Sequence, residues 1–433
     1  MKVFLRNVHL YLALAAGLVI MISCVTGAIL VFEDEFDHQF HPERYEIIPK
    51  GERLPLQQLV KTAVNSVHKA KVSAVKVFTD PKRPVEVALI KPEKKEGKGG
   101  DIQEEKVPDG KDGEGKGKNR KVKAPGEAAA KGKKGKDGNK KDEKAPKPSV
   151  YVYMNPYTGQ ITGTYNKREA FFTQVENLHR FLLGGQNSIG KTIIGLSTLS
   201  FLIITITGIV LWWPKNKKIL MQRLKFKTDG SFKRLNHDLH IVTGFYTSVF
   251  MTVIIMSGLV MVFTWVNKGI FTLTGTTQEN PKPPVTVYQA GKKAVALDVL
   301  ILNIDLKGKK AELYTIRMPK DSAGIFTVNV LPEDASIETA SDTYYLDQYS
   351  GAVIGQLKYA DKNIGQKIRS YVRPVHTGEV FGLPTKILNF ILCILTFSFP
   401  ITGVIMWLNR IKKSKNKKAK PTPKPRKREE VPA

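Results

Sequence analysis

Long apolar runs alternate with polar stretches along this chain of 433 residues. Four runs are long enough to cross a bilayer core of roughly 30 Å, which takes about 20 helical residues. None of the four contains an acidic, basic or histidine residue. They cover residues 10–32, 192–213, 241–265 and 387–408. The pattern predicts a membrane α-helical protein built on a four-helix transmembrane bundle.

The first run has a second interpretation as a cleaved signal peptide, with Cys24 at a lipoprotein-type site. The run continues past Cys24 through VTGAILVF and is too long for a typical signal core, which favours a membrane span. The only other cysteine, Cys393, also falls in a span, so we expect both to be small packing residues rather than part of a disulfide framework.

Basic residues predict the orientation of the spans, because Lys and Arg collect in cytoplasmic segments. Lys2 and Arg6 precede the first run, KNKKILMQRLKFK lies between the second and third, and RIKKSKNKKAK follows the fourth. All three groups share one side only if both termini are cytoplasmic. We therefore expect a multi-pass protein of the bacterial inner (plasma) membrane, with residues 33–191 and 266–386 facing the periplasm.

The formal net charge of +29 does not indicate nucleic-acid binding, because much of it flanks the spans. Another large part lies in residues 91–148, a Lys-rich segment with few large apolar residues. Such a segment cannot bury enough surface to offset its ordering entropy, so we expect a disordered insertion there and a disordered basic tail over 410–433.

The two halves of the chain repeat each other. His9 precedes Gly27 by eighteen residues, and His240 precedes Gly258 by the same eighteen. The second and fourth runs end in ITGIVLWW and ITGVIMWL, and YVYMNPYTGQITG resembles TYYLDQYSGAVIG. Each half reads as span, outer domain, span, which predicts two parallel repeats related by an axis along the membrane normal.

Each outer domain is predicted to be a small α+β unit. In LQQLVKTAVNSV the apolar residues fall on one helical face. VSAVKVF and VEVALI flank a DPKRP turn, and AELYTIRM and IFTVNVL flank PKDSAG, as expected of two hairpins. The two YMNPYTGQITG-like segments predict a further strand, turn and strand in each half.

The predicted divisions are helix 1 over 1–33, outer domain 1 over 34–188, helix 2 over 189–214, a cytoplasmic loop over 215–239, helix 3 over 240–266, outer domain 2 over 267–385, helix 4 over 386–409 and the tail over 410–433.

The repeat sorts four of the eight histidines into two pairs. His9 and His240 lie at the cytoplasmic ends of the first and third spans. His179 and His376 precede the second and fourth spans on the outer side, 29 and 27 residues before the matched glycines. A pseudo-twofold axis brings equivalent positions together, and two facing neutral imidazoles are the axial ligands of a low-spin b-type haem. We expect these pairs to bind two haems, with single interfacial rings as the alternative.

Other residues have weaker predicted roles. His237 is an alternative to His240, His38 and His41 have an i, i+3 spacing that metal sites also use, and His68 is expected on a polar face. Arg180 and Arg373 adjoin the outer histidines and can pair with either a haem propionate or a phospholipid headgroup. The tryptophans at the span ends indicate an aromatic belt in contact with membrane lipid.

Together HLYLALAAGLVIMISCVTGAILVFEDE, YVYMNPYTGQITG, LHRFLLGG and VHTGEVFGLP resemble the PepSY-associated transmembrane helix proteins, a group of iron-regulated bacterial inner-membrane proteins. The resemblance covers nearly the whole chain except the Lys-rich insertion and the tail. It implies two periplasmic PepSY domains and a similarity to ferric-siderophore reductases with two b-type haems. Carried over by position, His9 and His240 hold the inner haem, and His179 and His376 hold the outer haem.

The sequence and the resemblance predict a haem-containing inner-membrane electron-transfer protein that reduces a ferric chelate in the periplasm for iron acquisition. Electrons are expected to pass from the inner to the outer haem. No GxGxxG signal occurs, so the donor is a separate cytoplasmic reductase or a membrane quinol. One rival interpretation is a PepSY-domain regulator or sensor that binds peptidases. A second is a transporter, although the spans lack the charged residues that a substrate or proton path uses. A third is a structural anchor.

Overall fold

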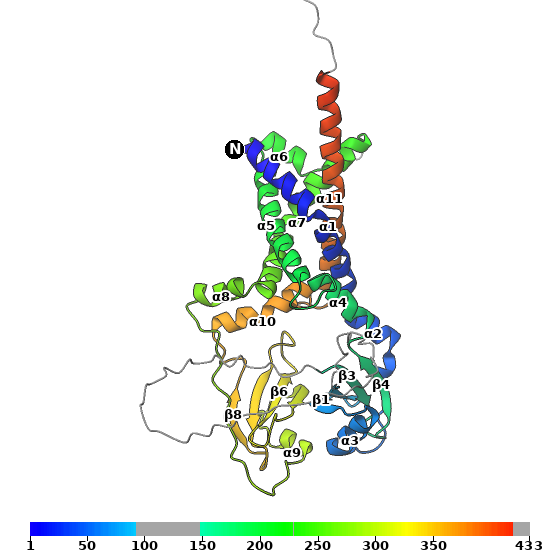
Figure 1. Cartoon of the computed structure of the whole chain (residues 1–433), viewed down its shortest axis with the longest axis vertical. Coiled ribbons are helices and arrows are strands. Elements are labelled where there is room, and N and C mark those ends of the chain that lie inside the picture. The colour runs from blue at the N-terminus through cyan, green and yellow to red at the C-terminus, as the bar shows by residue number, and fades with distance from the viewer. Residues whose placement is uncertain (92–147, 228, 419–433) are drawn as a thin grey trace, which may run out of the picture. The chain divides into compact units, whose positions relative to one another are not determined.

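A computed structural model describes residues 1–91, 148–227 and 229–418 of the chain (Figure 1). Most of the predicted insertion and the end of the predicted tail fall outside this described part. The short helices are α2 (Glu33–Phe40), η1 (Pro42–Arg44), α3 (Leu56–Ser66), α4 (Phe171–Phe181), α6 (Lys217–Arg223), α8 (Thr264–Leu273), α9 (Leu297–Leu302) and α10 (Ile364–Thr377).

Four long helices form the predicted bundle, and among the described residues these four are long and apolar enough to cross a membrane. They are α1 (Lys2–Leu30), α5 (Ile189–Trp212), α7 (Phe232–Val262) and α11 (Leu383–Lys418). They are apolar around most of their circumference, as expected of helices that face lipid and one another. The helices α1, α7 and α11 extend beyond their apolar runs, so His9 and His240 lie inside helices rather than at their ends.

The bundle is closed in the order α1, α5, α7, α11, with α11 packing back on α1. The first helices of the two halves, α1 and α7, are therefore diagonal neighbours. Its interior contains small residues and hydroxyl side chains, among them the buried Thr207 and Ser257. Their hydroxyls donate to carbonyls of the preceding helical turn, which satisfies them without water.

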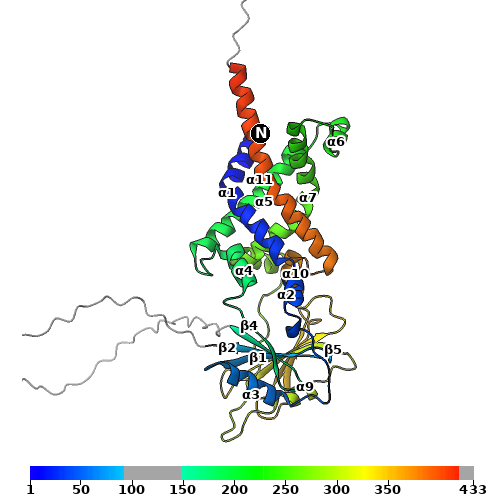
Figure 2. The ribbon, with the colours of Figure 1, turned by 90° about the vertical axis from the view of Figure 1, so that its right-hand side faces the viewer.

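The strands of both halves form one antiparallel eight-stranded sheet, in the order β4-β3-β2-β1-β5-β6-β7-β8 (Figure 2). The predicted hairpins are confirmed, and the halves join where β1 pairs with β5, with Val75 opposite Ile316. The strands are β1 (Lys71–Phe78), β2 (Val85–Ile90), β3 (Val150–Met154), β4 (Ile161–Asn166), β5 (Ala311–Arg317), β6 (Phe326–Pro332), β7 (Asp342–Leu346) and β8 (Val353–Leu357).

One face of the sheet carries the main core outside the bundle. The predicted apolar face of α3 is confirmed, since Leu56, Leu59 and Ala63 are buried against the strands. The helix α9 buries Leu297 and Leu300 in the same cluster, and α3 and α9 contact each other. The two helices therefore cover adjacent parts of one sheet face, one from each half.

Two further helices connect the sheet to the second span of each half. The helix α4 packs against α1 and α5, whereas α10 packs against α7 and α8. Asn363 and Gln366 form a capping box at the start of α10, and Gly378 ends it in the left-handed conformation. These two helices hold His179 and His376.

Candidate functional site

The structure brings His9 of α1 and His240 of α7 together inside the bundle. Their ring centroids are 6.4 Å apart, and the ring planes are inclined by 77°. We call them the terminal pair, because they lie near the ends at which the chain enters α1 and α7. The two rings line one cavity of about 490 Å³, whose other walls come from all four long helices.

His179 of α4 and His376 of α10 form a second pair, which we call the sheet-side pair. Their centroids are 6.2 Å apart, with the planes inclined by 63°. Burial lowers the pKa of His179 to about 4 and also lowers the pKa of His376 below its usual value. Both rings are therefore neutral at pH 7, which is the form that binds a metal ion. The predicted pairing of equivalent histidines is thus present at both ends of the bundle.

Each of the four rings is held at Nδ1 by a hydroxyl group from a neighbouring helix. His9 contacts Thr207 at 3.1 Å, and His240 contacts Thr402 at 2.8 Å. In the sheet-side pair the corresponding contacts are His179 to Thr26 at 2.9 Å and His376 to Ser257 at 3.0 Å. All four histidines therefore share one pattern, a hydrogen bond between Nδ1 and a hydroxyl group of a neighbouring helix.

The partners of these hydroxyls define which ring nitrogen carries the proton. Thr207 donates its own proton to the carbonyl of Ile203 at 2.8 Å, so its oxygen accepts from His9 Nδ1–H. His9 Nδ1 also lies 3.0 Å from the Ile204 carbonyl, which can only accept. A proton on Nδ1 leaves the lone pair on Nε2, and in the described part of the chain no protein group hydrogen-bonds Nε2 of the terminal pair.

A glycine follows each of the four hydroxyl residues and lets the ring approach closely. A methyl group on Gly208 would lie 3.3 Å from His9 Cε1, and one on Gly403 would lie 3.4 Å from His240 Cε1. Gly27 and Gly258 stand in the same relation to the sheet-side histidines, at 3.4 Å and 3.3 Å. The four Thr-Gly or Ser-Gly dipeptides thus form equivalent seats for the four rings.

Arginines are the charged residues that line the terminal cavity, apart from the histidines. Arg6 comes from α1, Arg223 from α6 and Arg410 from α11, and among the described residues no acidic one lines this cavity. The remaining walls are mostly apolar and include Trp212, which stacks on Phe245 with centroids 3.6 Å apart. The cavity therefore suits an apolar molecule with anionic groups. Sequence reasoning assigned these arginines only to membrane flanks, and no motif marked them.

The arginines predicted beside the sheet-side pair are placed at the surface. Arg180 donates to Glu176 at 2.6 Å and lies over the Phe181 ring, with a half-exposed side chain. Arg373 is exposed on α10. Their proposed contacts with propionates or headgroups stay predictions.

The other histidines lie apart from the facing rings, except His237. His237 also lines the terminal cavity but is half exposed, and its Nδ1 lies 3.3 Å from Asp238. His41 contacts Glu43, and His38 packs against Tyr45. His68 is exposed, as predicted. The described Cys24 and Cys393 are free thiols in the bundle, consistent with packing roles.

The fold and these sites define a membrane protein with four apolar helices and a separate antiparallel sheet region. The chain belongs to the family described as the PepSY-associated TM region, which matches residues 6–410 and confirms the predicted resemblance. A comparison with curated proteins found none that matches.

Proposed function

We propose that the chain is a haem-binding electron-transfer protein of the inner membrane that reduces ferric chelates or siderophores on the periplasmic side. The observation that carries the proposal is the two facing histidine pairs, each with Nδ1 held by a hydroxyl group. A metal-binding histidine commonly donates its second ring N–H to a neighbouring acceptor, which fixes the ring and raises its basicity. The arrangement at both ends of the bundle has this form.

The spacing of the rings fits a metal ion between them. Two imidazoles that each bind one ion through a nitrogen at roughly 2 Å have centroids about 6 Å apart. The observed separations are 6.4 Å and 6.2 Å. Each pair supplies two nitrogens, fewer than the three or four side chains that hold zinc, so the pairs suit an iron already held in a macrocycle.

The terminal cavity fits the rest of a haem. Its volume of about 490 Å³ lies in the range of pockets that enclose small organic ligands. Apolar walls match a porphyrin, and Arg6, Arg223 and Arg410 match its two carboxylates. His9 and His240 would hold this group, while His179 and His376 would hold a second one.

A haem in each site would supply a one-electron carrier. The contributions of the chain are to orient the ring nitrogens, to exclude water and to surround the site with apolar helices. No side chain has to act as acid, base or nucleophile for reduction of Fe(III) to Fe(II). The ferrous ion binds hard oxygen ligands more weakly, so reduction releases iron from its chelate.

The orientation of the chain in the membrane is part of the same proposal. Two parallel span-domain-span repeats with cytoplasmic termini place the sheet-side pair and the two PepSY-like halves of the sheet in the periplasm. The basic residues that flank the bundle near the terminal pair support this orientation. The ferric chelate is then reduced on the sheet side, and the electron donor is a quinol or a cytoplasmic reductase.

The visible spectrum of the full chain in detergent, with and without dithionite, tests the proposal. We expect b-type absorption bands, whose intensity falls by half in His9→Ala and by half in His376→Ala. The control His68→Ala, which changes an exposed ring, should keep the full intensity. Proteoliposomes should then convert a ferric chelate to Fe(II), followed with a ferrous-specific dye. A colourless protein from haem-replete cells would overturn the proposal.

A further inference from the structure

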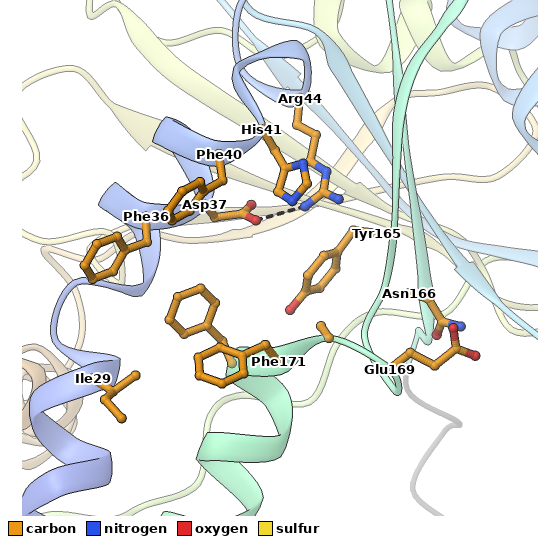
Figure 3. Close-up of a pocket in the computed structure, with 12 residues that line it drawn as sticks. Ile29, Phe36, Asp37, Phe40, His41, Arg44, Tyr165, Asn166, Glu169 and Phe171 are labelled. Carbon is orange, nitrogen blue, oxygen red and sulfur yellow. Dashed lines mark hydrogen bonds and ion pairs between the residues drawn. The ribbon is translucent and has the colours of Figure 1, made fainter.

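A second cavity, of about 590 Å³, lies where the end of α1 meets α2, η1, β4 and the first turn of α4 (Figure 3). Ile29, the last-turn residue of a membrane-spanning helix, forms one side of it. It shares no lining residue with the terminal cavity. The pocket is therefore a separate site at the level where a span leaves the bilayer.

Several aromatic side chains line this cavity. Phe36 is nearly parallel to Phe40, with an interplanar angle of 15°, and to Phe172, with an angle of 17°. Phe40, a member of this parallel set, is 70% exposed, whereas the exposed Phe171 is inclined by 74° to Phe172. A parallel and accessible ring face favours a planar ligand, because offset stacking adds to the gain from apolar burial.

One end of the pocket is polar, and it contains a hydrogen-bond donor without an acceptor. Arg44 donates from Nη1 to Asp37 at 2.9 Å and lies over the Tyr165 ring. Its Nε is buried and has no partner among the described residues. In Figure 3, Arg44, Asp37 and Tyr165 lie together at the upper side of the pocket, across from Phe171. Because Nε has almost no accessible surface, a shift of the Arg44 side chain would bring this N–H to a ligand oxygen at this end and satisfy it.

The charges around the pocket disfavour an anionic ligand. Asp37 already neutralises Arg44, and Glu169 also lines the cavity. The helix α2 begins with three consecutive acidic residues, Glu33 to Glu35. A phosphate or an anionic chelate would lie next to carboxylates, whereas a neutral ring with a carbonyl or hydroxyl oxygen would not.

We infer that this pocket binds the head ring of a lipid-soluble quinone or quinol. The planar ring lies against the Phe36 wall, one ring oxygen accepts from Arg44 Nε–H, and the isoprenoid tail leaves along α1 past Ile29 into the bilayer. Phe171 begins α4, and His179 follows eight residues later, about 12 Å along the helix. As a donor, a quinol here would pass its electrons to the sheet-side pair directly, and these electrons would not cross the terminal pair as the sequence led us to expect. This donor role rests on the proposed function, but binding of the ring does not.

Two conservative variants test the two features that recognise the ring. Arg44→Lys keeps a cation beside Asp37 but removes the Nε–H, and Phe36→Leu keeps an apolar side chain but removes the flat face. Phe381→Leu is the matched control, because Phe381 is 76% exposed and lies outside the pocket. The probe is heptylhydroxyquinoline N-oxide, a fluorescent quinone analogue, titrated into the full chain in phosphatidylcholine nanodiscs.

We expect saturable quenching of the probe, competed by short-tailed ubiquinone, with an affinity weakened about tenfold in Arg44→Lys and in Phe36→Leu. Phe381→Leu should match the wild type. Unchanged affinity in both pocket variants, or a pocket that retains only phospholipid and does not bind the probe, would overturn the inference. The same titration on a His179→Ala, His376→Ala double variant separates the two proposals, because the probe must bind there even if the chain holds no haem.

Discussion

His9 donates its Nδ1–H to Thr207, 3.1 Å away, and packs its Cε1 against Gly208, the next residue of the same helix. One dipeptide of α5 therefore fixes both the position and the tautomer of a ring carried by α1. The dipeptide beginning at Thr402 does the same for His240. Because each ring has its own dipeptide, one ring of the pair can be changed without altering the contacts that hold its partner.

Replacing Thr207 by Val should raise the reduction potential of the haem that we propose at the terminal pair and leave the potential of the other proposed haem unchanged. The hydroxyl acceptor increases the basicity of the His9 imidazole, which stabilises ferric iron. Loss of about 1 kcal/mol from this hydrogen bond corresponds to roughly 40 mV for one electron. Redox titration followed by visible spectroscopy measures both potentials.

Thr252→Val is the control for this change. Thr252 lies on α7 outside the lining of the terminal cavity, and its hydroxyl donates to the Ser248 carbonyl rather than to a histidine. The reduction potentials of this variant should match those of the wild type. An equal shift in Thr252→Val, or no shift in Thr207→Val with haem still bound, would contradict the positioning role of Thr207.

Gly208→Val should prevent binding of the haem that we propose at the terminal pair. Even a methyl group at Gly208 would lie 3.3 Å from His9 Cε1, so the larger valine displaces the ring from its seat. A haemochrome assay should give about half the haem per chain. Gly269→Val is the control, since nothing lies within 4 Å of a methyl group at Gly269. Full haem content in Gly208→Val would show that the close approach is not required.

Much of the fold follows from local pattern in the sequence. The apolar runs predicted the four long helices, and the turn residues predicted the hairpins, because each signal is complete within a few turns or strands. The union of both sets of strands in one sheet was not predicted. It depends on pairing between β1 and β5, with Val75 opposite Ile316, and these residues are far apart in the chain. A strand at the edge of one half does not encode its partner in the other half.

The histidine pairs were predicted because the repeat aligned them, but the groups that seat them were not. The dipeptides that begin at Thr26, Thr207, Ser257 and Thr402 do carry a signal, since a hydroxyl residue precedes each of the aligned glycines. The arginines of the terminal cavity carry none, because a basic residue beside a span looks the same whether it faces lipid or a cavity. Only the packing of α1, α6 and α11 shows that these arginines face a cavity rather than lipid.

Lys386→Met should lower the stability of the bundle by about 1–2 kcal/mol. Lys386 is 10% exposed and donates to Glu35 at 2.8 Å, which ties the start of α11 to α2. The estimate is below that for a fully buried pair because Glu35 is partly exposed. Thermal unfolding in detergent measures the change, in a double-mutant cycle with Glu35→Gln.

Lys309→Met provides the comparison, because Lys309 and Asp334 form a pair with both side chains exposed. Its unfolding midpoint should change little. A cycle in which Lys386→Met and Glu35→Gln are additive would show that the short contact does not stabilise the chain.

Glu33 should lower the stability of the protein as the pH rises from about 5 to 8, whereas the buried His179 and His376 change it in the opposite direction. Burial, with Asp34 and Glu176 nearby, raises the pKa of Glu33 from 4.5 to about 7. Between these two values the folded chain binds more protons at Glu33 than the unfolded chain, so stability decreases with rising pH. Glu33→Gln removes the titrating group, so its unfolding temperature should rise relative to that of the wild type across this window, with Glu52→Gln, at an exposed position, as the control. A constant difference between the unfolding temperatures of wild type and Glu33→Gln from pH 5 to 8 would show that Glu33 does not titrate there.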